Sequence, residues 1–242
     1  MSGRLVGVGV GPGDPELLTV KGLRALREAD AVFVPVGDAG ETGRAEAVVH
    51  HHLPERRPVR LRFAMTTEPQ ERRRSWERAG EAIAAEVAAG RAAAFATIGD
   101  PNLYSTFTYL ARTVRALVGG VAVETVPGVT AMQDLAARSG TVLAEGDESV
   151  ALFPLTAGEE GLRRALEVFD TVVCYKGGRR LPAVLAAARD AGQLDGAVYG
   201  AHLGLDGQTV RAAAEMHGRQ GPYLSTVILP ARRGHAPPED GR

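Results

Sequence analysis

Three turns rich in glycine and proline, each placed directly after a short apolar run, constrain the fold of this 242-residue chain more than any other feature. The turns occupy residues 9–15, 99–101 and 127–130. Glycine lets the backbone approach a ligand or another segment closely, and proline stiffens a turn. Each apolar run has the length of a buried strand, and residues with helical spacing follow each turn. This alternation predicts an α/β layer built on a mostly parallel sheet.

The spacing of apolar residues also predicts where the other elements lie. It is most clearly helical over residues 68–89, with Gly90 at the position of a C-terminal cap. Asp14 followed by Pro15 is typical of an N-cap and the first residue of a helix. Further helices are predicted at residues 41–52, 103–117, 130–138 and 181–191. Strands are predicted at residues 5–10, 31–35, 57–63, 92–98, 121–126, 149–155, 171–175, 197–202, 209–213 and 224–229.

The second half of the chain alternates less regularly than the first. Its last three predicted strands are joined by short connections, which favours an antiparallel or mixed sheet. We therefore expect two α/β domains, 1–119 and 120–233, with the boundary at a pair of glycines. The polar segment 234–242 is expected to be a disordered tail.

Composition excludes several classes of protein. No run approaches the ~20 apolar residues of a membrane helix, and the glycine-interrupted start with Arg4 as its one basic residue is not a signal peptide. The single cysteine, Cys174, excludes a disulfide framework and a multi-thiolate metal site. A net charge of −1 and a pI near 6.6 provide no basic field for nucleic acid. We expect a cytoplasmic protein without a membrane or nucleic-acid partner.

Several kinds of chemistry are also disfavoured. A dinucleotide fingerprint, G-x-G-x-x-G, would place its third glycine on Asp14 or on Pro12, and the sequence has no phosphate loop. The run 50–52 consists of three histidines, but consecutive helix residues point in different directions, so we expect a solvated helix end and no metal site. Cys174 follows two valines and is expected to be a buried strand thiol. The glycine-rich turns themselves have two open interpretations: tight strand-to-helix connections, or a ligand site beyond the carboxyl ends of the strands.

At these turns the sequence resembles the tetrapyrrole methylase family, the S-adenosylmethionine-dependent enzymes of corrin and sirohaem synthesis. The segments that carry the resemblance are 7–22, 99–110 and 126–140, with weaker matches at 143–154, 172–188 and 222–229. Within the family, residues 100–107 and 144–148 resemble the precorrin-2 C-20 methyltransferases. The sequence departs from the family pattern at Gly200-Ala201-His202, where an acidic-basic pair is usual, and at Arg44-Ala45-Glu46, where a small polar residue is expected.

The resemblance implies two α/β domains with S-adenosylmethionine held in the cleft between them, and a homodimer. Carried over by motif, the cofactor-binding residues are Pro12, Gly99, Asp100, Leu103, Tyr104, Ser105, Thr106, Thr130, Ala131, Tyr175, Lys176, Ala201, Ser225, Thr226 and Val227. Methylation at a ring carbon requires the later loss of a proton, so a base within hydrogen-bond reach would help. Asp14 and Asp100 are the candidates for this catalytic role, and each is equally interpreted as an N-cap.

The tetrapyrrole substrate implied by the resemblance carries eight carboxylates, which basic side chains must meet. Arginine suits this task because its guanidinium binds a carboxylate through two parallel hydrogen bonds. The candidate substrate-binding residues are Lys21, Arg44, His50, Arg60, Arg62 and Arg72. For each of them, a solvated surface charge is the alternative interpretation.

The sequence thus leads to the hypothesis of an S-adenosylmethionine-dependent methyltransferase that acts on carbon 20 of precorrin-2 or cobalt-precorrin-2 in cobalamin biosynthesis. One alternative is another tetrapyrrole methylase that acts at a different carbon. A second is a ribosomal RNA ribose methylase or a diphthine synthase of the same superfamily, and the neutral pI argues against RNA. A third is a non-catalytic module that binds S-adenosylmethionine. The sequence leaves open whether the substrate contains cobalt.

Overall fold

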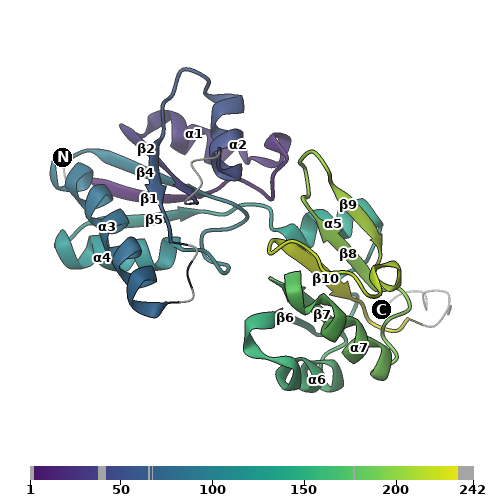
Figure 1. Cartoon of the computed structure of the whole chain (residues 1–242). Helices are drawn as coiled ribbons and strands as arrows, with labels where there is room; N and C mark the ends of the chain where they lie inside the picture. Colours follow the sequence, from purple (N-terminus) through teal and green to yellow (C-terminus); the bar gives the residue numbers. More distant parts are fainter. Residues whose placement is uncertain (1–2, 38–41, 65, 67, 177, 234–242) are drawn as a thin grey trace. The chain divides into compact units, whose positions relative to one another are not determined.

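The structure of the chain, a computed structural model, describes residues 3–37, 42–64, 66, 68–176 and 178–233. The chain divides into two compact units, residues 1–130 and 131–242, each with its own sheet (Figure 1). The expected tail 234–242 lies outside the described residues.

The first unit contains a five-stranded parallel sheet. Its strands are β1 (Arg4–Gly9), β2 (Ala31–Val36), β3 (Val59–Arg62), β4 (Ala92–Thr97) and β5 (Ala122–Val126), in the order β3-β2-β4-β1-β5. Every pair of neighbours is parallel, which confirms the predicted sheet type. The central strands are almost entirely apolar because helices cover both faces of the sheet.

Helices cover the two faces of this sheet in pairs. On one face, α1 (Val20–Glu28) and α2 (Arg44–His52) contribute Leu26 and Val48 to a cluster with Val8 of β1. On the other face, α3 (Pro69–Ala88) and α4 (Phe107–Leu117) pack Ile83 and Leu110 against alternate strand residues. Successive side chains of β1 and β4 point to opposite faces of the sheet, so each strand contributes residues to both clusters.

The second unit contains a mixed sheet, as the sequence predicts. Its strands are β6 (Val150–Pro154), β7 (Thr171–Tyr175), β8 (Val198–Ala201), β9 (Thr209–Ala212) and β10 (Ser225–Leu229), in the order β6-β7-β10-β8-β9. β6 and β7 are parallel, whereas β10 is antiparallel to both β7 and β8, and β8 is antiparallel to β9. The helix α5 (Ala131–Ser139) packs on the face that contains Ile228, and α6 (Glu159–Val168) and α7 (Leu181–Asp190) pack on the opposite face.

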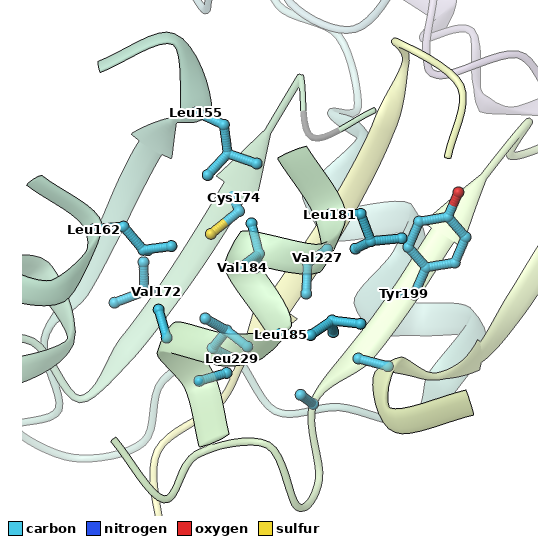
Figure 2. Close-up of a cluster of buried hydrophobic side chains, with 14 of the residues drawn as sticks. Leu155, Leu162, Val172, Cys174, Leu181, Val184, Leu185, Tyr199, Val227 and Leu229 are labelled. Carbon is cyan, nitrogen blue, oxygen red and sulfur yellow. The ribbon is translucent and has the colours of Figure 1, made fainter. Parts of the chain in front are cut away.

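The core beneath α6 and α7 contains the single cysteine. Figure 2 shows Cys174 on β7 among apolar side chains that include Leu155, Leu162 and Val184. Burial raises the pKa of its thiol to about 12, so the group stays protonated. The expectation of a buried strand thiol is confirmed.

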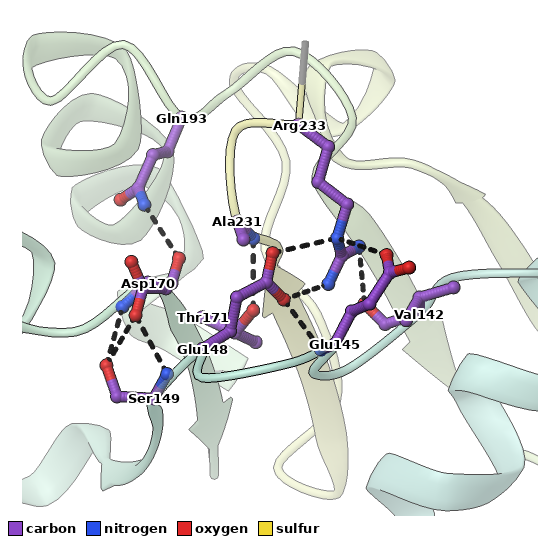
Figure 3. A network of polar contacts seen from close by, with 9 residues as sticks. All are labelled: Val142, Glu145, Glu148, Ser149, Asp170, Thr171, Gln193, Ala231 and Arg233. Atoms are coloured by element: carbon purple, nitrogen blue, oxygen red, sulfur yellow. Dashed lines mark hydrogen bonds and ion pairs between the residues drawn. The ribbon is translucent and has the colours of Figure 1, made fainter. Parts of the chain in front are cut away.

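A polar network joins the segments that flank β6, β7 and β10 in this unit (Figure 3). Arg233, just beyond β10, donates through Nε to Glu148 at 2.9 Å and through Nη1 to the carbonyl of Val142 at 3.1 Å. Asp170 accepts from both the backbone N–H and the hydroxyl of Ser149, at 2.8 and 2.7 Å. The segment after β10 is therefore fastened to the loop that precedes β6.

Several element boundaries differ from the sequence prediction. Asp14 caps only the short 3₁₀ helix η1 (Pro15–Leu17), and α1 begins at Val20 with Thr19 as its cap, because Leu18 is extended. α4 begins at Phe107 rather than residue 103, since Tyr104 has a φ of +51°. α6 was not predicted at all.

The unit boundary also differs from the expected position at residues 119–120. The structure divides after Thr130, because β5 pairs with β1 along its length and so belongs to the first sheet. Over the described ranges, no helix combines the length and apolar character needed to cross a membrane. Within the same ranges, no group of three or more histidine, cysteine, aspartate or glutamate side chains is arranged to hold a metal ion.

Candidate functional site

The three glycine-rich turns meet at the carboxyl edge of the first sheet. β1 lies between β4 and β5, so the turns that follow these strands are neighbours. The first and second turns are joined directly, because the N–H of Gly99 donates to the carbonyl of Gly11 at 2.8 Å. Gly99 has a φ of +67°, which glycine adopts without steric cost.

All three turns approach one another so closely that side chains are excluded between them. A Cβ on Gly9 would lie 2.6 Å from the backbone nitrogen of Gly128 and against the carbonyl oxygen of Gly99. A Cβ on Gly128 would meet the same carbonyl. A Cβ on Gly99 would lie 4.0 Å from the Cα of Thr130, so the second and third turns are also in contact. Neither Gly9 nor Gly128 was among the predicted site residues.

Asp100 fastens the second turn to the third. Its Oδ2 accepts from the N–H of Gly128 at 3.1 Å, and its Oδ1 accepts from the N–H of Asn102 at 2.8 Å. The amide of Asn102 donates in turn to Thr125 of β5 at 3.1 Å. Both carboxylate oxygens of this candidate base are therefore already hydrogen-bonded to backbone.

Asp14, the other candidate base, has a capping role. Its Oδ1 accepts from the N–H of Glu16 at 3.0 Å, as an N-cap residue does. The N-cap interpretation of Asp14 is confirmed, and its catalytic role stays a prediction.

The segment after Asp100 carries four predicted cofactor residues. Tyr104 is 40% exposed and adopts the left-handed backbone conformation, and partial burial raises the pKa of its phenol. Ser105 accepts from the N–H of Phe107, the first residue of α4, at 3.2 Å and shares a hydrogen bond with Thr97 at 3.0 Å. Leu103 and Thr106 flank this pair and are half-buried. Pro12, in the first turn, is buried, whereas Thr130 and Ala131, at the start of α5, are half-buried.

The predicted residues of the second unit gather where β7 and β8 end. In the register of the sheet, Thr226 is paired with Tyr175 and Ser225 with Ala201. Tyr175 packs on the α5 side, whereas Ala201 and Val227 belong to the core beneath α7. The side chains of Ala201 and Val227 are therefore buried in that core and do not face a ligand.

Two non-glycine residues just past these strand ends have left-handed backbone conformations. Lys176 follows β7 with a φ of +61°, and His202 follows β8 with a φ of +50°. Such strained residues concentrate at functional sites. Burial lowers the pKa of Lys176. His202 was not predicted as a site residue, and nothing in the sequence reveals its conformation.

The predicted substrate-binding residues fall into separate groups. Arg60 donates from Nε to Glu46 at 2.7 Å, which brings β3 to the first turn of α2, where Arg44 also lies. Arg62 lies two residues after Arg60 on the same strand, and burial lowers the pKa of Arg44. Glu46 itself is buried. This cluster brings together three of the six residues.

The other three residues lie apart from this cluster. Lys21 and His50 are exposed on α1 and α2, and Arg72 lies on α3, which covers the opposite face of the sheet. The histidine run also differs from expectation, because only His50 and His51 are exposed. His52 donates from Nε2 to the carbonyl of Pro15 at 2.8 Å and so anchors the first turn.

Comparisons with known proteins find a matching family model and several similar sequences. The family model described as Tetrapyrrole (Corrin/Porphyrin) Methylases matches residues 4–215. A precorrin-2 C(20)-methyltransferase of Sinorhizobium sp is 38% identical over 237 residues, which cover 94% of this chain and 95% of the relative. A cobalt-precorrin-2 C(20)-methyltransferase of Salmonella typhimurium is 33% identical over 232 residues, which cover 95% of this chain and 97% of the relative.

A solved structure supports the fold. The uroporphyrin-III C-methyl transferase of Thermus thermophilus, complexed with S-adenyl homocysteine, aligns with a TM-score of 0.62 at 22% identity. The alignment covers 93% of this chain and 96% of that one.

Proposed function

The chain belongs to the tetrapyrrole (corrin/porphyrin) methylase family, and on this premise we propose that it methylates carbon 20 of precorrin-2 or cobalt-precorrin-2, with S-adenosylmethionine as the methyl donor. The observation that carries this proposal is the 38% identity to a precorrin-2 C(20)-methyltransferase, which extends over nearly the whole of both chains. The reaction would belong to cobalamin biosynthesis.

The residues at the carboxyl edges fit the proposed methyl donor. When bound, S-adenosylmethionine supplies an electrophilic methyl group on a sulfonium cation. Its cationic centre and zwitterionic tail call for carbonyls, hydroxyls and aromatic surface rather than a phosphate-binding cradle. At the edge of the first sheet, half-buried Thr130 carries a hydroxyl, and Tyr104, which is 40% exposed, presents an aromatic ring in the segment that follows Gly99. A solved structure of the same fold with S-adenyl homocysteine supports this assignment.

We propose that Asp100 acts chiefly as a positioning residue. Because both of its carboxylate oxygens accept backbone hydrogen bonds, it holds the second and third turns in register. Alignment of donor and acceptor is the main task in methyl transfer between bound reactants, and it can lower a barrier by about 7–11 kcal/mol. Turns held by Asp100 and by His52 would supply that alignment.

For the tetrapyrrole, we propose that Arg44, Arg60 and Arg62 bind carboxylates of the substrate. Glu46 accepts a hydrogen bond from the Nε of Arg60 at 2.7 Å, which orients the guanidinium. Lys21 on α1 and His50 on α2 would bind further carboxylates of the substrate from the same side of the sheet.

Product analysis tests the reaction. The purified protein is incubated with precorrin-2 and with cobalt-precorrin-2, each together with methyl-¹³C S-adenosylmethionine, and the products are examined by NMR. Label at carbon 20 supports the proposal, and the faster of the two substrates identifies the natural form. Label at another carbon would assign a different methylase of the family. Tight cofactor binding with no turnover on either substrate would favour the non-catalytic alternative.

The family resemblance also leads us to propose a homodimer that works in the cytoplasm. Sedimentation equilibrium at several protein concentrations tests the first point, since a monomer would give a mass near 25.4 kDa at each of them. Fractionation of cells that express the protein tests the second.

A further inference from the structure

An aromatic pair joins the two helices that cover one face of the first sheet. The rings of Trp76 on α3 and Tyr109 on α4 are stacked, with centroids 4.1 Å apart and planes 9° from parallel. The helices lie side by side (Figure 1) because Gly80, one turn after Trp76, has no side chain to meet Thr113. A Cβ on Gly80 would lie 2.6 Å from the Cβ of Thr113.

A guanidinium group also lies over each ring of this pair. The Cζ of Arg72 lies 5.6 Å from the centroid of Trp76, and the Cζ of Arg112 lies 5.6 Å from that of Tyr109. In the part of the chain that the structure describes, neither arginine forms an ion pair with a carboxylate. Arg112 is exposed and Tyr109 is 41% exposed, so water reaches this surface.

Helix packing alone does not account for the two cations. Glu68 stands four residues before Arg72, at a spacing that permits an ion pair on a helix, yet Arg72 lies over Trp76 instead. A guanidinium held over a ring by a cation–π contact loses rotational freedom before any ligand arrives, and its N–H groups can still donate to that ligand. Two such groups, one over each ring of the stacked pair, are suited to two well-separated carboxylates of the same ligand.

We propose that Arg72 and Arg112 form a two-point site for carboxylate groups, with Trp76 and Tyr109 as the positioning residues that hold them. The site deepens the proposed function and rests on it for the identity of the ligand, because the tetrapyrrole of that reaction carries eight carboxylates. Arg112 is thereby added to the substrate-binding residues predicted from the sequence.

Trp76 is the only tryptophan of the chain, so its fluorescence reports on the stack directly. The full-length protein is titrated with dodecanedioate, a colourless dicarboxylate that does not quench by energy transfer and whose two carboxylates can reach guanidinium groups on opposite sides of the stacked rings. We expect a saturable change in emission that requires about fivefold more ligand in Arg72→Ala and Arg112→Ala. Arg115→Ala is the matched control, since Arg115 is exposed on the same helix and lies over no ring. Absence of a saturable change, or an equal loss in Arg115→Ala, would overturn the site.

Steady-state kinetics test whether the carboxylates are those of the substrate. Arg112→Ala should raise KM for precorrin-2 about fivefold, with a much smaller change in kcat and in the Kd of S-adenosylhomocysteine. Tyr109→Leu should act in the same direction and Tyr109→Phe should restore the wild-type KM, because phenylalanine keeps the stacked ring. An unchanged KM in Arg112→Ala, beside a positive titration, would contradict the assignment to the substrate. If the wild-type protein does not turn over precorrin-2, the proposed function fails, and the titration still decides whether the carboxylate site exists.

Discussion

The carboxylate of Asp100 accepts a hydrogen bond from the backbone N–H of Gly128, 3.1 Å away and twenty-eight residues further along the chain. This bond crosses from the turn after β4 to the turn after β5. Since β1 lies between these strands, the two turns joined by this bond lie on either side of the turn that follows β1. This one side chain therefore ties the second turn to the third.

Substitution of Asp100 separates a positioning role from a proton-transfer role. Asp100→Ala removes both acceptors and should lower the free energy of unfolding by about 1–3 kcal/mol, measured by urea denaturation. It should also weaken the binding of S-adenosylhomocysteine, measured by calorimetry. Asp100→Asn keeps one acceptor oxygen and should retain much of the turnover. Loss of turnover in Asp100→Asn with unchanged stability and cofactor affinity would instead identify Asp100 as the base.

The contact among the turns makes a second prediction, at Gly9 and Gly128. Alanine at either position would place a methyl group against the carbonyl of Gly99, and the turns would have to separate. We expect a loss of about 1–3 kcal/mol in unfolding free energy, together with weaker cofactor binding. Gly119→Ala is the control, because a Cβ there meets no atom within 4 Å. Equal stability of Gly9→Ala and Gly119→Ala would show that the turns are less tightly packed than this structure indicates.

Much of the fold could be predicted from the sequence because buried parallel strands leave a strong signal. β1 and β4 are covered on both faces, so they appear as nearly continuous apolar runs, and the turns after them are rich in glycine. α6 could not be predicted in this way. Its buried residues, Leu162, Ala165 and Leu166, form a narrow stripe among charged residues, and Gly161 lies within the helix.

The site could be predicted only to the level of its turns. Parallel strands end at the same edge of a sheet, so the three turns were expected near one another. The partners of Asp100 and His52 lie twenty-eight and thirty-seven residues away, and they depend on the strand order and on the packing of α2. The positive φ angles of Lys176 and His202 likewise arise from the tertiary structure, since neither residue type requires that conformation.

The cluster around Glu46 predicts how substrate affinity responds to the loss of single charges. Arg44→Ala should raise KM for the tetrapyrrole and leave the affinity for S-adenosylhomocysteine unchanged, because Arg44 lies on α2 rather than in a glycine-rich turn. Lys21→Ala should act in the same way and more weakly, since Lys21 is exposed to water. Steady-state kinetics and calorimetry on the same preparations measure the two quantities. An equal loss of both affinities would refute the assignment.

The environment of Cys174 predicts a thiol that does not react in the native protein. Its pKa of about 12 leaves almost no thiolate at pH 8, and the side chain is buried. Iodoacetamide at pH 8 should therefore leave the folded protein unlabelled, whereas the protein in 6 M guanidinium chloride should take up one equivalent, as mass spectrometry would show. Rapid labelling of the folded protein would mean that the core around β7 opens readily.

The network in Figure 3 predicts how the second unit responds to acid. The guanidinium of Arg233 lowers the pKa of Glu148, and hydrogen bonds from Ser149 lower the pKa of Asp170. A carboxylate whose pKa is lower in the folded state stabilises that state fully above its unfolded pKa, about 4, and this contribution disappears as the pH falls through the folded value. The second unit should therefore lose stability below about pH 4.

Variants that remove the partners of these carboxylates should shift the acid transition in a defined direction. Arg233→Gln and Ser149→Ala each remove the cause of a lowered pKa, so the carboxylate titrates closer to its unfolded value and the stability gained above about pH 4 becomes smaller. Circular dichroism followed from pH 7 to pH 2 should show the transition at higher pH in both variants than in the wild type. Arg164→Gln is the control, because Arg164 and its partner Glu160 are both more than 70% exposed on α6 and such pairs contribute little. An acid transition in Arg233→Gln and Ser149→Ala that coincides with that of Arg164→Gln would show that the segment after β10 does not stabilise this unit through its charges.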